Sequence, residues 1–178
     1  MKQSQINGEA VVRLASLSGV RRWSAARLLA VPILSVVLAC SANPRSFFGG
    51  EITAQLQVDD HVNQNSPVPV ELLVVYDDKL LEYLLGIDAQ KWFSERAQML
   101  RDHPDEKAFV SSYWELVPGQ TPLIKKVSFG TGARGAVVFA NYFSEGKHRV
   151  RLDPHKDVVI HLRDTDFCVE PACMEPAK

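Results

Sequence analysis

The chain has 178 residues, of which 46% are hydrophobic, and its 20 basic and 21 acidic side chains leave a net charge of −1. This length and composition suit one globular domain with its own core and argue against a disordered chain. From Cys40 onward there are 15 basic and 20 acidic residues. The basic surface that nucleic-acid binding requires is missing, so no nucleic-acid partner is expected.

Residues 1–39 have the order of a secretory signal peptide. Arg21, Arg22 and Arg27 precede the apolar stretch Leu28–Ala39, and a basic region followed by a short apolar region is typical of such signals. The apolar stretch has 12 residues, whereas a membrane-spanning helix needs about 20. We therefore expect a signal that is removed, and not a permanent transmembrane helix.

The residues at the end of this signal indicate lipidation. Val37-Leu38-Ala39-Cys40 fits the bacterial lipobox, in which the cysteine thiol receives a diacylglyceryl group and the new amino terminus is acylated, for example with palmitate. Several buried acyl chains anchor a protein where one chain alone would not. Cys40 is therefore the predicted lipidation site, with residues 40–50 as a polar tether. Ser41, in place of an Asp, favours the outer membrane. The alternative is an ordinary buried cysteine.

Two strands and a loop are predicted after the tether. Apolar and polar residues alternate over Glu51–Val58, as in a strand that is buried on one face. Asp59–Pro67 is a cluster of turn-forming residues and predicts an exposed loop. Val68–Tyr76 is rich in β-branched residues, with Pro69 near its start, and predicts a second strand.

The middle of the chain changes to helical spacing. A short helix is predicted over residues 80–86 and a longer one over Ala89–Arg101, with Asp88 as its N-cap. The longer helix carries an apolar stripe, which we expect to pack in the core and not to bind a cofactor: Trp92, Phe93, Ala97 and Leu100.

Strand signals return in the second half. Five strands separated by turns are predicted: Tyr113–Val117, Leu123–Phe129, Gly135–Phe143, His148–Leu152 and Asp157–Arg163. The expected fold class is mainly β, an antiparallel β-sandwich over residues 51–165 with a short helical insertion. Residues 166–178 are expected to form a C-terminal tail.

That tail contains Cys168 and Cys173. In an oxidising compartment, two cysteines at this separation can form a disulfide bond. We expect this bond, with free thiols as the alternative. A metal site would need more nearby Cys or His ligands than His161 supplies, so no metal is expected.

The sequence holds no recognisable catalytic motif. Its histidines lack metal-binding spacing, and there is no nucleophile elbow, P-loop or dinucleotide-binding motif. The pairs Asp59-Asp60 and Asp77-Asp78 are interpreted as solvated loop ends, because neighbouring strand residues point to opposite faces. We therefore expect that the protein is not an enzyme and carries no cofactor apart from the lipid on Cys40.

Several local motifs occur in a characteristic order. A strand, a loop and a strand ending in Tyr (VDDHVNQNSPVPVELLVVYD) are followed by a helix with Trp92-Phe93, the turn Leu116-Val117-Pro118-Gly119-Gln120 and the strand GAVVFANYF. In this order, from about Ile52 to Arg163, the chain resembles the TssJ family (also called SciN or VasD). These are the outer-membrane lipoproteins of type VI secretion systems.

Two stretches depart from the pattern of that family. Asp102–Ser112 is unusually polar, and Phe143-Ser144 stands where the family commonly has Arg-Asp.

The resemblance implies a transthyretin-like β-sandwich, lipid-anchored on the periplasmic face of the outer membrane. It also implies binding to the C-terminal periplasmic part of TssM, which ties the TssJ–TssL–TssM complex to that membrane. The family contacts TssM through the loop after the first strand, here Asp59, Asp60, His61, Val62, Asn63, Gln64, Asn65 and Ser66. From its residues alone this stretch is a polar loop of the kind that often carries recognition, or a connection without a partner.

Two other functions stay open. A pilotin-like lipoprotein of another envelope secretion machine would bind a short segment of an outer-membrane secretin. A small-ligand-binding periplasmic module, or an enzyme, would need a concave pocket with converging polar groups. The inward positions of the predicted strands are instead filled by Val, Ile, Leu and Phe.

Overall fold

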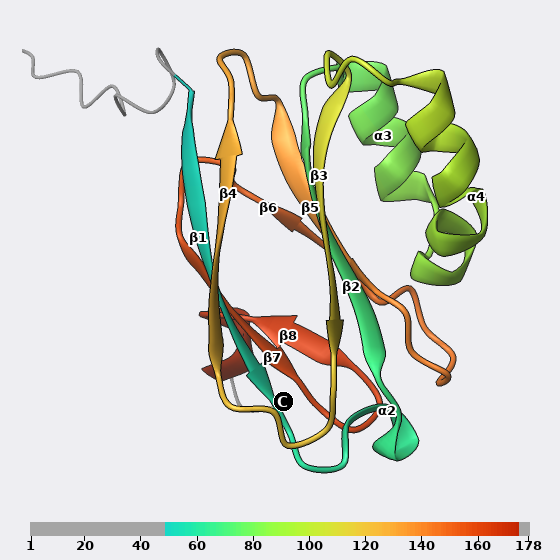
Figure 1. Ribbon diagram of the computed structural model, residues 1–178, viewed down its shortest axis with the longest axis vertical. Helices are drawn as coiled ribbons and strands as arrows, with labels where there is room; N and C mark the ends of the chain where they lie inside the picture. Colours follow the sequence, from blue (N-terminus) through green and yellow to red (C-terminus); the bar gives the residue numbers. More distant parts are fainter. Residues whose placement is uncertain (1–48, 175–178) are drawn as a thin grey trace, which may run out of the picture. The chain divides into compact units, whose positions relative to one another are not determined.

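A computed structural model describes residues 49–174. Eight strands form two four-stranded sheets that face each other (Figure 1). Sheet A has the strand order β4-β1-β7-β8 and sheet B the order β3-β2-β5-β6. Neighbouring strands are antiparallel except β1 and β7, which are parallel. The predicted β-sandwich is therefore confirmed.

The elements have the following bounds in chain order: β1 Gly50–Val58, α2 Val62–Asn65, β2 Val68–Val75, α3 Asp78–Gly86, α4 Ala89–Asp102, β3 Phe109–Leu116, β4 Leu123–Phe129, β5 Gly135–Ala140, β6 Arg149–Leu152, β7 Val158–Leu162, β8 Phe167–Val169 and the 3-10 turn η1 Ala172–Met174. The helices α3 and α4 lie against the outer face of sheet B (Figure 1). Within residues 49–174, no helix is long and apolar enough to cross a membrane.

The central strands of sheet B, β2 and β5, are buried on both faces, which explains their composition. In β2, Val70 and Val74 pack in the core between the sheets, while Leu73 and Val75 pack under the helices. In β5, where all six residues are buried, Ala136 and Val138 likewise pack between the sheets, and Val137 and Phe139 pack under the helices. A strand covered on both sides is expected to be a nearly continuous apolar run.

Both helices begin at capping aspartates. The Asp77 carboxylate accepts a hydrogen bond from the Leu80 backbone N–H, and the Asp88 carboxylate accepts one from Lys91, both at 2.8 Å. Each cap of this kind contributes about 1 kcal/mol. The predicted N-cap at Asp88 is confirmed.

The apolar stripe of α4 was predicted correctly only in part. Trp92 is fully buried and stacks on Phe139, with ring centroids 5.5 Å apart. Ala97, however, is exposed, so its assignment to the core was wrong. The neighbouring Arg96 reaches the sheet instead, because it has a buried partner there.

That partner is Glu71, a fully buried carboxylate on β2. It accepts hydrogen bonds from Trp92 Nε1 at 2.8 Å and from Arg96 Nε at 2.7 Å, and the Ser111 hydroxyl donates a third. A buried charge is costly unless it is paired and hydrogen-bonded. These contacts therefore fix α4 over β2 and β3.

Two strand boundaries differ from the prediction. β3 begins at Phe109, four residues before the predicted start at Tyr113. β3 is the edge strand of sheet B and pairs with β2, so it tolerates polar residues such as Ser111 and Ser112. These polar residues interrupt the apolar pattern from which a strand is predicted. β8, which pairs with β7, lies in the expected tail and was not predicted, because three residues give too short a pattern.

Candidate functional site

The loop expected to bind a partner lies at one end of the sandwich. Asp59–Ser66 follows β1, whose first residue, Gly50, lies at the opposite end (Figure 1). The nine residues of β1, at about 3.3 Å each, separate these ends by roughly 30 Å. We call the end with Gly50 the tether end and the end with Asp59–Ser66 the distal end.

The loop contains a left-handed turn. Asn63, Gln64 and Asn65 have φ values of 48°, 56° and 60°. This conformation costs most L-residues about 1 kcal/mol or more, and Asn is among the non-glycine residues that adopt it most readily. The two asparagines are therefore a signal of this turn within the predicted loop.

Asn63 holds the loop in place. Its side chain is buried; Nδ2 donates to the Pro67 carbonyl at 3.0 Å, and Oδ1 accepts the Phe143 backbone N–H at 2.8 Å. Its own backbone N–H donates to the Asp164 carbonyl at 2.8 Å. Asn63 thus joins three loops, which we call the distal loop cluster: residues 59–66, 141–148 and 163–166.

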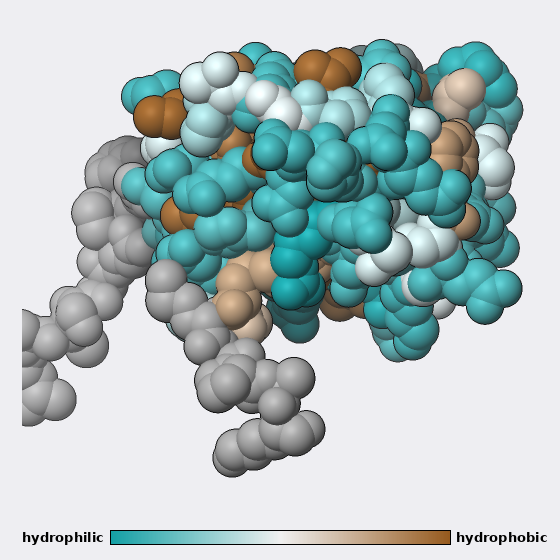
Figure 2. All heavy atoms as spheres, turned by 90° about the horizontal axis from the view of Figure 1, so that it is seen from below, coloured by the Kyte–Doolittle hydropathy of each residue, from teal (hydrophilic) through white to brown (hydrophobic). Residues whose placement is uncertain are grey.

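The residues of the predicted binding loop divide into two groups. Val62 and Asn63 are buried, so they support the loop from inside. The side chains at its surface are polar: Asp59, Asp60, His61, Gln64, Asn65 and the half-buried Ser66. Figure 2 shows the molecule from the distal end, where hydrophilic residues cover most of the face and a few hydrophobic patches interrupt them.

The turn between β3 and β4 packs against the same loop. The Gly119 backbone N–H donates to the Asp59 carbonyl at 3.1 Å, and Gly119 has a φ of 65°, which glycine adopts without steric cost. The Gln120 side chain closes the turn by accepting the Val117 N–H at 3.1 Å. Two motifs that carry the family resemblance, the loop and the Leu116–Gln120 turn, are therefore neighbours in space.

Ser144, His148 and Asp166 have the residue types of a nucleophilic triad, but not its geometry. His148 Nδ1 lies 3.1 Å from Asp166 Oδ1, and Nε2 lies 3.4 Å from Ser144 Oγ. Nε2 is closer, at 2.9 Å, to the Ser144 carbonyl, and Ser144 Oγ donates to the Thr165 carbonyl at 2.5 Å. A ring nitrogen that donates to a carbonyl cannot accept the hydroxyl proton. The cluster instead clamps the loop at 141–148 to the loop at 163–166.

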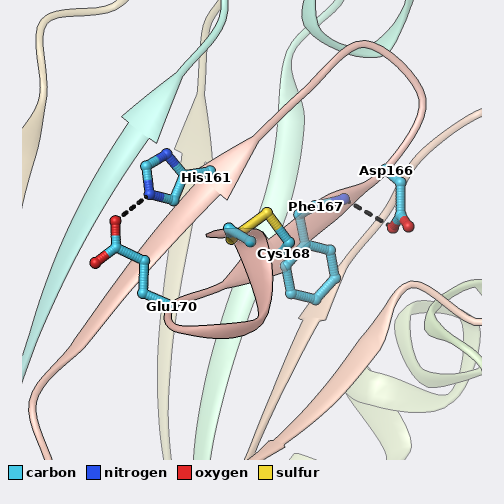
Figure 3. The surroundings of a disulfide bond; sticks show 6 residues. His161, Asp166, Phe167, Cys168 and Glu170 are labelled. Carbon is cyan, nitrogen blue, oxygen red and sulfur yellow. Dashed lines mark hydrogen bonds and ion pairs between the residues drawn. A yellow bond between two sulfur atoms is a disulfide. The ribbon is translucent and has the colours of Figure 1, made fainter. Parts of the chain in front are cut away.

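A disulfide bond joins Cys168 of β8 to Cys173. Beside it, His161 of β7 lies 2.8 Å from the Glu170 carboxylate, as Figure 3 shows. The two interactions hold the turn after β8 against the edge of sheet A. Among the described residues, no group of three His, Cys, Asp or Glu side chains could hold a metal ion.

A surface cavity of about 570 Å³ lies at the other end of the molecule. Tyr76, Val110 and Phe129 line it together with the charged side chains of Glu106 and Lys107. The Gly130 backbone N–H donates to the Tyr76 hydroxyl at 2.8 Å, so this polar group is already engaged. The cavity lies at the tether end and includes no residue of the distal loop cluster.

The predicted lipidation site, Cys40, lies outside the described residues, as do the signal peptide at 1–39 and most of the tether at 40–50. Lipidation and signal cleavage therefore stay predictions.

The fold, but not the sequence, is similar to that of known proteins. No protein-family model matches the chain, and no curated protein sequence matches it. Among solved structures, it is similar to Serratia marcescens Lip, described as a membrane-bound component of the Type VI Secretion System. The TM-score is 0.53 at 16% identity, over 72% of this chain and 99% of that one.

Two further similar chains belong to the structures described as the T6SS protein TssM C-terminal domain (869–1107) from EAEC and as the Type VI membrane complex. Each has a TM-score of 0.52 at 14% identity, over 68% of this chain and 98% of the other. At such low identity the likeness shows the fold alone. The chain therefore has the fold of components of type VI secretion membrane complexes.

Proposed function

We propose that this protein is an outer-membrane lipoprotein of the TssJ family that anchors a type VI secretion membrane complex. In this role the lipid on Cys40 holds the protein at the membrane, and the distal loop cluster binds the periplasmic part of a TssM-like inner-membrane protein. The fold shared with Lip and with a chain of a type VI membrane complex supports the proposal.

The observation that carries the proposal is the separation of the two ends. The chain enters the sandwich at Gly50, whereas Asp59–Ser66 lies at the distal end. The residues from Cys40 to Gly50 can span at most about 35 Å, and β1 adds about another 30 Å. A lipid at one end therefore leaves the loop at the other end free to meet a partner that comes from the inner membrane.

The loop is also suited to recognition because it is rigid. Asn63 and the Gly119 hydrogen bond fix its backbone, while its exposed side chains stay polar. A loop that is ordered before binding loses little conformational entropy when the complex forms.

Co-purification from a detergent-solubilised envelope tests the proposal. The test variant, Asp60→Lys with Gln64→Lys, changes two exposed loop residues and leaves the buried Val62 and Asn63 intact. The matched control, Glu82→Lys with Gln90→Lys, makes the same charge change at exposed positions on α3 and α4.

We expect wild type and control to retain a TssM-like protein, identified by mass spectrometry, and the loop variant to lose it. Recovery of a secretin instead, or equal retention by all three proteins, would contradict the proposal.

A further inference from the structure

Phe143 is unusually exposed for an aromatic residue. Within residues 49–174, two large apolar side chains are about two-thirds exposed: Phe143 at 66% and Ile124 at 67%. Ile124 lies on the edge strand β4, and a single exposed apolar residue of this kind is common. Phe143 differs because it belongs to the distal loop cluster, and its backbone N–H bonds to Asn63 of the loop Asp59–Ser66.

The backbone around Phe143 is held on both sides. Its N–H donates to Asn63 Oδ1 at 2.8 Å, the preceding Tyr142 is buried, and the following Ser144 hydroxyl donates to the Thr165 carbonyl. The His148 clamp then fixes the same loop to Asp166. An aromatic side chain on an already ordered backbone can be buried by a partner at a low entropic cost.

The distal loop cluster that carries Phe143 is acidic. The distal loop cluster contains two basic side chains, Lys147 and Arg163, and five acidic ones: Asp59, Asp60, Glu145, Asp164 and Asp166. With histidines neutral, its net charge is −3. Complementary charge at an interface speeds association and selects against partners of like charge.

From these observations we infer that Phe143 is the apolar anchor of the partner interface and that the acidic residues around it form its rim. The surface fits a protein partner that presents an apolar pocket bordered by Lys and Arg side chains. Buried aromatic residues within a polar rim commonly dominate the energy of protein interfaces. The inference rests on the proposed function and extends the binding surface beyond the loop at Asp59–Ser66.

The test compares Phe143→Ser with Ile124→Ser, two equally exposed apolar residues of which only Phe143 lies in the distal loop cluster. Lipoprotein and partner are co-purified in detergent from envelopes, and dissociation of the captured TssM-like protein is followed over time. We expect Phe143→Ser to accelerate dissociation at least tenfold and Ile124→Ser to leave it unchanged.

A second arm tests the rim independently of Phe143. Asp60→Asn with Asp164→Asn should slow association and reduce its dependence on salt concentration, because two exposed charges are removed. Circular dichroism checks that each variant is folded. If Phe143→Ser does not fold, this charge arm still decides whether the acidic rim takes part.

The outcomes separate this inference from the proposed function. Unchanged dissociation of Phe143→Ser, equal losses with Ile124→Ser, or a Phe143-dependent dimer of the lipoprotein would overturn the inference while partner binding stands. An unchanged salt dependence in the charge arm would overturn the acidic rim. If the wild type captures no TssM-like protein, the proposed function itself fails.

Discussion

Asn63→Ala should destabilise the protein far more than its position in a surface loop suggests. The variant removes both side-chain hydrogen bonds of Asn63, the one donated to the Pro67 carbonyl and the one accepted from the Phe143 N–H. It also leaves alanine at a φ of 48°, which favours Asn over Ala.

The expected magnitude follows from these contributions. Two largely buried hydrogen bonds contribute about 1 kcal/mol each, and the left-handed conformation costs alanine about 1 kcal/mol more than asparagine. The free energy of unfolding should fall by about 3 kcal/mol. At a urea m-value of about 2 kcal/mol/M, the unfolding midpoint shifts down by roughly 1.5 M.

Urea unfolding of the detergent-solubilised lipoprotein, followed by the fluorescence of Trp92 and Trp114, measures this loss. Asn65→Ala is the matched control, because Asn65 has a similar φ of 60° but is exposed, and its side chain bonds to the exposed His61 Nδ1. Its loss should be about 1 kcal/mol. Equal losses in the two variants, or no loss in Asn63→Ala, would refute the role assigned to Asn63.

Other predictions concern the rest of the sandwich. Arg96→Ala leaves the Glu71 carboxylate buried without its cation and should lower the free energy of unfolding by about 3 kcal/mol. Lys91→Ala breaks the exposed pair with Glu95 and should lower it by less than about 0.5 kcal/mol. Urea unfolding compares the two variants. Cys168→Ser with Cys173→Ser opens a short loop and should cost about 2 kcal/mol, and a loss below about 0.5 kcal/mol would contradict this. Burial, with the nearby Asp166 carboxylate, raises the pKa of Tyr142 above the ordinary 10.0. The unfolded chain then releases this proton at lower pH than the folded one, so the free energy of unfolding should fall as pH rises above about 10. Tyr142→Phe should flatten that fall in alkaline unfolding curves.

Most of the sandwich could be predicted because its signals are local. The alternation over Glu51–Val58 and the apolar run starting at Gly135 depend only on which faces of a strand are buried. The structure confirms both strands, although β5 ends at Ala140 and not at Phe143. Phe143 was included in the strand because it is apolar, yet it is exposed in the distal loop cluster.

The division of the loop into buried and exposed residues could not be predicted. Asn63 is buried because it bonds to Phe143, a residue 80 positions away, and to Asp164. Turn-forming residues look alike in the sequence whether their side chains face solvent or a neighbouring loop. Arg96 was missed for a similar reason, since its partner Glu71 lies on another element.

In the proposed complex the distal end, and not the tether end, contacts a TssM-like partner. A photo-cross-linking amino acid at Gln64 in the loop, or at the exposed Glu106 beside the tether-end cavity, tests this in intact cells. We predict a cross-linked product with the TssM-like protein from position 64 and none from position 106. A product from position 106 alone, or from neither position, would show that the distal end does not contact this partner.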